Sequence, residues 1–214
     1  MSIIFNFLSG LLNSIFTFTG DWGLAIVLLT IGVRLALSPM SFKQKKSLQH
    51  QQKLAIKMQE IKEKYKDDKE KLEVEVKKNS VQSAKSMMGC LATLAQLPIL
   101  MTMWSVFNKI PVSVGTYLIP WVASIKVSDS YFIVPLIYVM VSLTPSLLSY
   151  VTLLKIEGQA RISKTNIIIM AVVGLFVAKA APIAVGIYLI TTSVFNFLEE
   201  LVFRIYMKKL KTEN

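Results

Sequence analysis

Apolar residues are gathered in five long blocks along the chain, and polar segments separate these blocks. A helix needs about 20 apolar residues to cross the hydrocarbon core of a bilayer. The blocks approach that length, with approximate limits 22–38, 86–107, 131–154, 165–178 and 183–203. The fourth block is short, so its helix needs help from its flanks or from a thinner membrane. The pattern predicts an all-α polytopic membrane protein with five transmembrane helices.

The first 20 residues carry apolar side chains along one helical stripe and polar side chains beside it. The stripe consists of Ile3, Ile4, Phe7, Leu8, Leu11, Leu12, Ile15 and Phe16. We interpret residues 1–20 as an amphipathic helix that lies on the outer face of the membrane. An uncleaved signal anchor is the alternative, and the absence of Lys and Arg from this segment disfavours it.

Lys and Arg are distributed unevenly among the segments that separate the blocks. Of the 24 Lys and Arg, twenty fall in segments 43–85, 155–164 and 204–211, which five crossings place on one side. The opposite side holds Lys109, Lys126 and Lys179. Under the positive-inside rule, this predicts a bacterial plasma-membrane protein with its N-terminus outside and its C-terminus in the cytoplasm. The net charge of +11 then indicates ribosomal RNA or anionic lipid as a nearer partner than DNA.

The Lys-rich segment after the first block predicts a cytoplasmic helical hairpin. Pro39 is expected to close the first membrane helix. Apolar residues then recur at spacings of four, three and four, at Leu54, Met58, Ile61 and Tyr65. Residues 66–69 carry a turn signal, after which a second, shorter helix packs back on the first. The alternative for this segment is a solvated, mobile charged linker.

These patterns divide the chain into ten segments. The outer-face helix at 1–20 precedes membrane helices at 21–41, 86–107, 131–154, 165–180 and 182–203. Between and after them lie the cytoplasmic hairpin 42–85, the extracellular loop 108–130, the cytoplasmic loop 155–164 and the basic cytoplasmic tail 204–214. Ser128, Asp129 and Ser130 are expected to cap the third membrane helix, and Pro182 fits the first turn of the last one.

Four of the five predicted spans carry polar side chains on one helical face, in the half nearer the cytoplasm. Residues three or four apart share a face. The stripes are Thr30, Arg34 and Ser38; Gly89, Thr93 and Gln96; Ser142, Ser146 and Ser149; and Thr192, Asn196 and Glu199 or Glu200. Four stripes at one depth predict a wet groove that is open to the cytoplasm and closed on the outer side. For any single Ser or Thr, a bond to its own helix or a neighbouring helix is the alternative.

Arg34 is the charged residue inside the first predicted span. An arginine at the centre of a membrane helix costs about 2.5–3.5 kcal/mol, so such a residue indicates function by default. The alternative is a side chain that snorkels to the headgroups, because Ser38 near the inner end is roughly 6 Å away along the helix. Glu199 and Glu200 lie nearer the surface, so we expect Arg34 to lack a permanent partner. Glu200 is expected to pair with Arg204 at the i,i+4 spacing.

Residues for catalysis, metals or nucleotides are scarce in this sequence. Cys90 is the one cysteine and His50 the one histidine, so neither a disulfide framework nor a Cys/His metal site can be built. The glycine-rich P-loop pattern is absent from the sequence. We therefore expect a protein that is not an enzyme and that needs neither a metal nor a cofactor.

Three stretches of the chain resemble one known family. "VRLALSPMSFKQKKSLQHQQKLAIKMQEIKEKYKDD" resembles the first core helix and the cytoplasmic hairpin of the YidC/Oxa/Alb family of membrane protein insertases. "GCLATLAQLPILMTMWSVF" resembles the second core helix of that family, and "APIAVGIYLITTSVFNFLEE" resembles its last. The match runs from about residue 21 to residue 200, in a short form without a large extracytoplasmic domain.

The resemblance implies a five-helix core around a hydrophilic groove that opens to the cytoplasm and the lipid. It places the groove arginine at Arg34 and the polar groove residue of the second helix at Gln96. Together with the polar stripes, it gives the substrate-contacting candidates Arg34, Thr30, Gln96, Thr93, Ser146, Ser149, Thr192 and Asn196. This sequence departs from the family at Tyr188-Leu189, where many relatives have Tyr-Trp, and at Glu199-Glu200, where Gln-Gln is common.

The resulting hypothesis is an insertase and chaperone for small membrane proteins that acts alone or beside the Sec translocon. Implied partners are nascent membrane proteins, membrane lipids, and the ribosome and targeting factors at the hairpin and basic tail. A small transporter or channel is one alternative, which the lack of acidic residues near the middle of any span disfavours. A passive assembly subunit is the other alternative, and it predicts that function survives Arg34→Ala.

Overall fold

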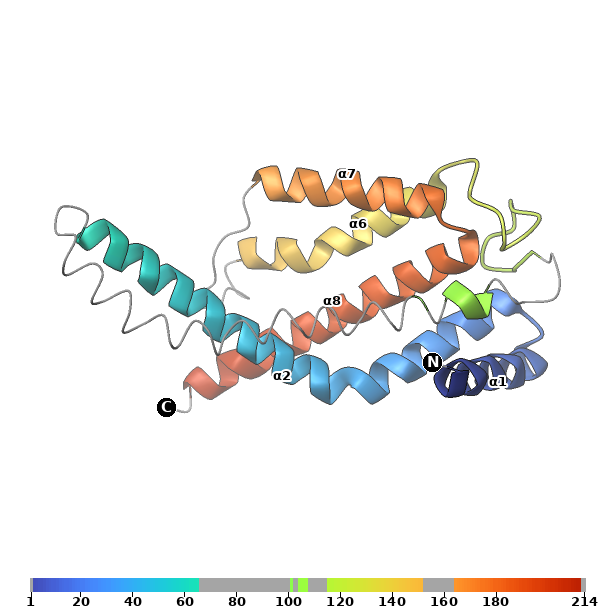
Figure 1. Cartoon of the computed structure of the whole chain (residues 1–214), viewed down its shortest axis with the longest axis horizontal. Coiled ribbons are helices and arrows are strands. Elements are labelled where there is room, and N and C mark those ends of the chain that lie inside the picture. Colours follow the sequence, from blue (N-terminus) through green and yellow to red (C-terminus); the bar gives the residue numbers. More distant parts are fainter. Residues whose placement is uncertain (1, 66–100, 102–103, 108–114, 152–163, 213–214) are drawn as a thin grey trace.

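The computed structural model describes residues 2–65, 101, 104–107, 115–151 and 164–212. This part of the chain consists of helices and loops without a strand, so the predicted all-α class is confirmed for it. The helices are α1 (Ser2–Thr19), α2 (Trp22–Lys64), α6 (Ile133–Leu147), the 3-10 helix η1 (Leu148–Tyr150), α7 (Lys164–Ala180) and α8 (Ile183–Thr212). Figure 1 shows α6 between α7 and α8, with α2 on the other side of α8.

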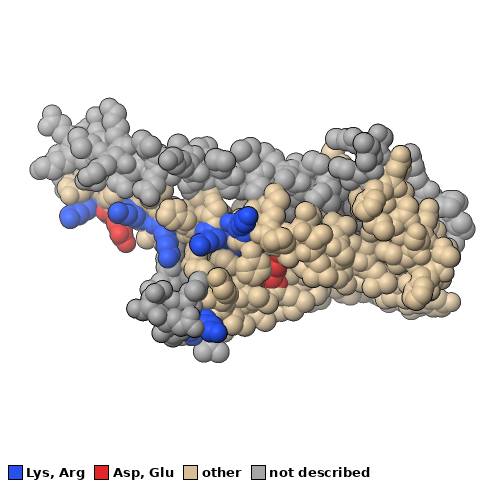
Figure 2. Space-filling view, turned by 90° about the horizontal axis from the view of Figure 1, so that it is seen from below, with Lys and Arg blue, Asp and Glu red and all other residues tan. Residues whose placement is uncertain are grey.

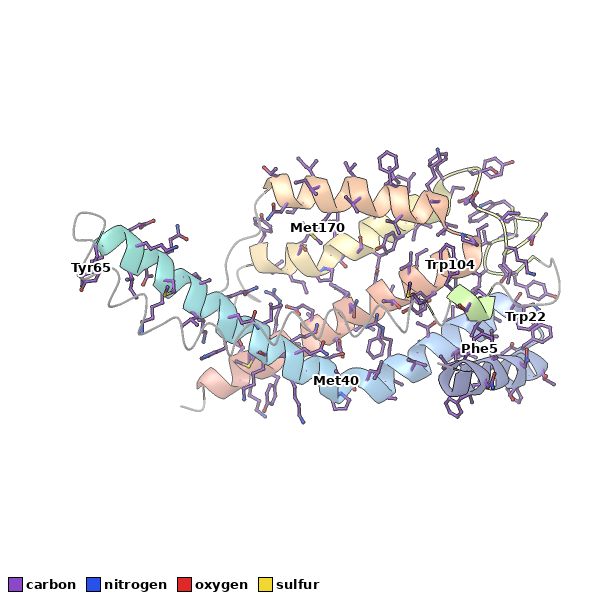
Figure 3. The ribbon with its side chains drawn as sticks, in the orientation of Figure 1. Phe5, Trp22, Met40, Tyr65, Trp104 and Met170 are labelled. Carbon is purple, nitrogen blue, oxygen red and sulfur yellow. The ribbon has the colours of Figure 1, made fainter. Side chains whose placement is uncertain are left out.

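The expectation that Pro39 closes the first helix is wrong, because α2 continues through Pro39 to Lys64. A proline removes the N–H that would bond the carbonyl four residues earlier. In α2 that carbonyl belongs to Leu35, and the Ser38 hydroxyl donates a hydrogen bond to it over 2.9 Å. The helix therefore bends without ending, and Met40 lies at the bend (Figures 1 and 3).

A second proline inside a helix is accommodated in the same way. Pro145 lies within α6, where it deprives the Val141 carbonyl of its N–H donor. The Thr144 hydroxyl donates to that carbonyl over 2.6 Å. Hydroxyl groups of this kind allow a helix to contain proline in surroundings that offer no water.

The predicted N-terminal helix forms as α1 and packs on the start of α2. Leu8 and Leu12 from its apolar stripe are buried, and the Phe16 ring stacks on Trp22 with 4.0 Å between ring centroids. Phe7, on the same stripe, stays exposed. One side of the stripe thus faces the protein, while the other side keeps an apolar surface.

The loop at 115–130 closes the end of the molecule at which α2 and α8 begin. The backbone N–H groups of Ile183 and Ala184 donate to the carbonyls of Val127 and Ile125, which satisfies the first turn of α8. The Asp129 carboxylate accepts from the Val134 N–H over 2.8 Å and so bonds the first turn of α6, although the N-cap position itself is Phe132 and not one of the three predicted residues. This end also contains the apolar core, with Ile26, Ile125, Ile183, Ala184 and their neighbours buried.

Two of the described helices are long and apolar enough to cross a membrane. They are α2, with a mean hydropathy of 1.9 in its best window, and α8, with 1.3. The helices at Ile133–Leu147 and Thr165–Ala180 are apolar but shorter. The predicted second span, 86–107, lies almost wholly outside the described residues, as does the second arm of the predicted hairpin.

Candidate functional site

Arg34 lies half-buried on α2 and points towards α8. Its Nη1 donates a hydrogen bond to Oδ1 of Asn196 over 3.1 Å, and the two residues are 162 positions apart in the chain. The expectation that Arg34 lacks a permanent partner is therefore wrong, because Arg34 has a hydrogen-bond partner in Asn196. The partner is a neutral amide, and among the described residues Arg34 forms no ion pair.

A cavity of about 210 Å³ lies between α6 and α8. It is lined by Tyr138, Ser142 and Pro145 of α6 and by Leu189, Thr192, Ser193 and Asn196 of α8. Such a volume holds several water molecules, since each occupies about 30 Å³ in the liquid. Asn196 belongs both to this wall and to the contact with Arg34, so one hydrogen bond connects the guanidinium to the cavity wall.

The candidate groove residues are placed in three different ways. Thr192 and Asn196 line the cavity, and the buried Thr192 hydroxyl has no hydrogen-bond partner among the described residues. Thr30 is 1% exposed and donates to the Ile26 carbonyl of its own helix, which was the alternative for a single Ser or Thr. Ser146 is half-buried one turn after Ser142, outside the residues that line the cavity. Thr93, Gln96 and the side chain of Ser149 lie outside the described residues.

Two polar residues of the cavity were missed from the sequence. Tyr138 lies four positions before Ser142, so extension of the α6 stripe by one helical turn would have found it. Ser193 lies next to Thr192 in the sequence but off the predicted stripe, and periodicity gave no signal for it. The cavity wall is therefore wider on α8 than a stripe with strict helical spacing.

A cluster of four charged side chains lies near Arg34, where α2 and α8 meet. Glu200 accepts from Arg204 Nε over 2.8 Å, which confirms the predicted i,i+4 pair. Lys45 of α2, which the sequence did not single out, lies 3.0 Å from Glu200 Oε2 and 3.9 Å from Glu199 Oε2. Phe42 and Phe203 pack edge to face beside the cluster, with 5.8 Å between centroids. Glu199 and Glu200 thus each have a cation as a partner, and neither carboxylate forms an ion pair with Arg34.

The opposite end of α2 is held by a buried carboxylate. Asp21 is 4% exposed and accepts hydrogen bonds from the N–H groups of Leu24 and Tyr117 and from the Thr116 hydroxyl. Burial by itself raises the pKa of the Asp21 carboxyl, but these hydrogen bonds outweigh burial and the pKa lies below its ordinary value. A charged Asp21 therefore fixes the loop at 115–130 to the first turn of α2.

The geometry offers hydrogen-bonding groups in a partly apolar cavity, and one lining residue, Asn196, bonds the guanidinium of Arg34. Among the described residues, no three His, Cys, Asp or Glu side chains lie close enough together to hold a metal ion. Such a wall can bind a polar or acidic peptide segment reversibly. The arrangement defines a helical membrane protein with a polar cavity beside a half-buried arginine.

Comparison with known proteins identifies the family. A family model described as 60Kd inner membrane protein matches residues 14–211, which is nearly the whole chain. The chain belongs to this family, which is the YidC/Oxa/Alb family indicated by the sequence resemblance.

Individual relatives differ widely in the share of their length that matches. The chain is 41% identical over 129 residues to the membrane protein insertase YidC of Wolinella succinogenes, which is 59% of this chain and 24% of that protein. The chain is 36% identical to the protein of the same name from Helicobacter pylori, over 59% of this chain and 23% of that protein. The insertase YidC of Caldanaerobacter subterraneus subsp. tengcongensis matches over the full length of both chains with 26% identity. The chain thus spans about a quarter of the first two relatives and all of the third.

Proposed function

We propose that the chain crosses the membrane five times, with its N-terminus outside and its C-terminus in the cytoplasm. The helices α2 and α8 supply two spans, α6 and α7 supply two shorter ones, and residues 86–107 supply the fifth. The distribution of charge supports this orientation. In Figure 2, Lys and Arg gather at one end of the visible face, over the second half of α2, while the other end is mostly uncharged. The apolar α1 then lies against the outer leaflet, where its exposed Phe7 and Phe18 contact lipid.

We infer that the protein is a membrane protein insertase and chaperone that works without enzymatic chemistry. The observation that carries this proposal is the half-buried Arg34, which contacts a cavity wall and bonds a neutral amide in place of a carboxylate. A guanidinium in these surroundings attracts an acidic group more strongly than it would in water. The names of the relatives, which are membrane protein insertases, support the same function.

The proposed groove combines the cavity between α6 and α8 with the polar residues of the first and second spans. Its proposed substrate contacts are Arg34, Thr93, Gln96, Ser146, Ser149, Thr192 and Asn196, whereas the buried Thr30 supports the wall of the first span through its bond to Ile26. The short hydrophilic flank of a substrate enters this groove from the cytoplasm and is drawn towards Arg34. The apolar segment of the substrate then partitions into lipid, which supplies the driving force, and the membrane potential assists acidic flanks.

Two short helices support a low barrier to passage of the substrate flank through the membrane beside the cavity. With 15 and 17 residues, α6 and α7 are about 22 and 25 Å long, and η1 adds about 6 Å to α6, whereas the hydrocarbon core is about 30 Å thick. A membrane that adapts to these helices is thinner beside the cavity. The flank of the substrate therefore crosses a shorter apolar distance.

The partners proposed for the cytoplasmic face follow from its charge. The second half of α2 carries seven lysines from Lys43 to Lys64 and extends beyond the other labelled helices in Figure 1. We propose that it meets the ribosome, targeting factors or the emerging chain, together with the basic residues at the end of α8. Cooperation with the Sec translocon and contact with anionic lipid complete this proposal.

The test is insertion by the purified protein in lipid vesicles. Single-span precursors with an acidic or a neutral flank are added, and protease protection measures how much of each has inserted. We expect Arg34→Ala to lower insertion of the acidic-flanked precursor strongly and Arg34→Lys to lower it less, because lysine keeps the charge. Two results would contradict the proposal: no more insertion than in protein-free vesicles, or acidic-flank insertion by both variants at the level of the unaltered protein.

Water access tests the groove independently of insertion. Single cysteines at positions 96, 146 and 192 are offered a membrane-impermeant thiol reagent from either side, in a chain whose Cys90 is replaced by serine. Labelling from the cytoplasmic side alone is the expected result. If these sites stay unlabelled from that side, the groove is not open to the cytoplasm.

A further inference from the structure

The carboxylates of Glu199 and Glu200 lie near Arg34. Either of them could neutralise the charge that the proposed function of Arg34 requires. Asn196, which bonds Arg34, precedes Glu199 by three residues and Glu200 by four on α8, so the three side chains share one face. Side chains at this spacing start about 5–6 Å apart. A guanidinium held by Asn196 is therefore about one helical turn from a carboxylate that could neutralise it.

Glu199 has an oxygen that could accept such a bond. Its side chain is 5% exposed, and its buried Oε1 has no hydrogen-bond partner among the described residues. A buried acceptor without a donor is unfavourable. The guanidinium of Arg34 has five N–H donors in a planar fork that matches a carboxylate. Without another influence, local chemistry favours an ion pair between Arg34 and Glu199.

Lys45 is the cation that opposes this pair. Its Nζ is 3.0 Å from Glu200 and 3.9 Å from Glu199, so one ammonium group attracts both carboxylates, and Glu199 interacts more strongly with Lys45 than with Arg34. Lys45 is 19% exposed, which leaves its charge only partly screened by solvent. Arg204 holds Glu200 from the other side over 2.8 Å. The two carboxylates are thereby matched by two cations that are not Arg34.

We propose that Lys45 is a positioning residue that holds Glu199 and thereby keeps Arg34 available to acidic groups of the substrate. This inference rests on the proposed function of Arg34 and adds a specificity-determining contact to it. Loss of Lys45 releases Glu199, which then pairs with Arg34 and blocks it. Loss of both Lys45 and Glu199 removes the blocking group and leaves Arg34 available again.

The experiment compares Lys45→Ala, Lys45→Arg, Glu199→Gln and the double variant Lys45→Ala/Glu199→Gln in vesicles. For an acidic-flanked precursor, we expect Lys45→Ala to lower insertion about tenfold, as expected for one charge-assisted hydrogen bond. Insertion of a neutral-flanked precursor should change less than about twofold. The double variant should restore acidic-flank insertion, and Lys45→Arg should keep it. A purely structural role of Lys45 would affect both precursors alike, and Glu199→Gln would not rescue it.

A chemical readout makes the inference testable without insertion. Phenylglyoxal modifies accessible, unpaired arginines, and mass spectrometry of the peptide that contains Arg34 measures the extent. We expect modification to fall in Lys45→Ala and to return in the double variant. Equal modification in all variants would overturn the role of Lys45, even if Arg34→Ala confirms the proposed function. If Arg34→Ala inserts acidic flanks normally, the proposed function fails, while the modification experiment still decides whether Lys45 shields Arg34.

Discussion

Replacing Asn196 by aspartate places a permanent counter-ion against Arg34. The side chains of asparagine and aspartate have nearly the same shape, so the 3.1 Å contact from Arg34 Nη1 is retained while a neutral acceptor becomes an anion. The variant therefore tests whether an available charge on Arg34 matters, with little change in packing.

The size of the effect follows from the contact distance. Two unit charges about 4 Å apart attract by about 4 kcal/mol at an effective dielectric constant of 20. Desolvation of the new carboxylate offsets part of this attraction, and hydrogen bonds between charged groups contribute about 1.5–3 kcal/mol net. That range corresponds to a factor of about 10–150 in the fraction of protein whose Arg34 is free to bind.

The assay is the vesicle insertion of precursors that differ only in the charge of their flank. We expect Asn196→Asp to lower acidic-flank insertion about 10–150-fold and to change neutral-flank insertion little. Asn196→Ala is the matched control, because it removes the contact with Arg34 without adding a charge to the cavity wall. Acidic-flank insertion by Asn196→Asp at the unaltered level, or an equal loss in both variants, would refute the reasoning.

Three further expectations concern stability, measured by thermal unfolding of purified protein in detergent. An added Cβ at Gly23 would lie 2.9 Å from Thr116 Cβ and closer still to its hydroxyl oxygen, which bonds Asp21, so Gly23→Ala should lower Tm by about 3–8 °C. Gly23→Ala should cost less in a Thr116→Gly background, which lacks the clashing side chain, and an equal loss in both backgrounds contradicts the clash. Because the folded pKa of Asp21 lies below its unfolded value near 4, its charged form stabilises the fold above that value, so Asp21→Asn should lower Tm at pH 7. This difference should shrink as pH falls through the folded pKa, and a pH-independent difference would contradict it. Ser38→Ala should lower Tm because it leaves the Leu35 carbonyl unpaired. In a Pro39→Ala background, which restores the backbone N–H, the same substitution should have little effect. Equal losses of Tm in both backgrounds would exclude a stabilising role for the bond from Ser38 to Leu35.

Local features of this fold could be predicted from the sequence, because they depend on residues within one or two helical turns. The stripe of α1, the bond of Asp129 to the first turn of α6 and the pair of Glu200 with Arg204 are all of this kind. Spacing alone fixes which side chains share a face of a helix. The polar face of α8 with Thr192 and Asn196 was accordingly identified, and the structure places both residues in the cavity wall.

Contacts between helices could not be predicted in the same way. Arg34 bonds Asn196 across 162 positions, and Lys45 bonds Glu200 across 155. Periodicity defines the face of each helix but not its rotation or height against another helix, which packing determines. For this reason the sequence placed Arg34 and Asn196 in one groove without pairing them, and it did not distinguish Lys45 among the many lysines nearby.

The continuation of α2 through Pro39 does have a local signal, which the described prolines reveal together. The two that lie inside helices, Pro39 and Pro145, each follow a hydroxyl residue that bonds the carbonyl left without its N–H donor. Pro120, Pro135 and Pro182 follow apolar residues, and they lie in a loop, in the first turn of α6 and directly before α8. At those places a proline leaves no helix carbonyl unpaired. In an apolar helix, Ser-Pro or Thr-Pro therefore indicates that the helix continues past the proline, because the hydroxyl makes the bond that water cannot supply there.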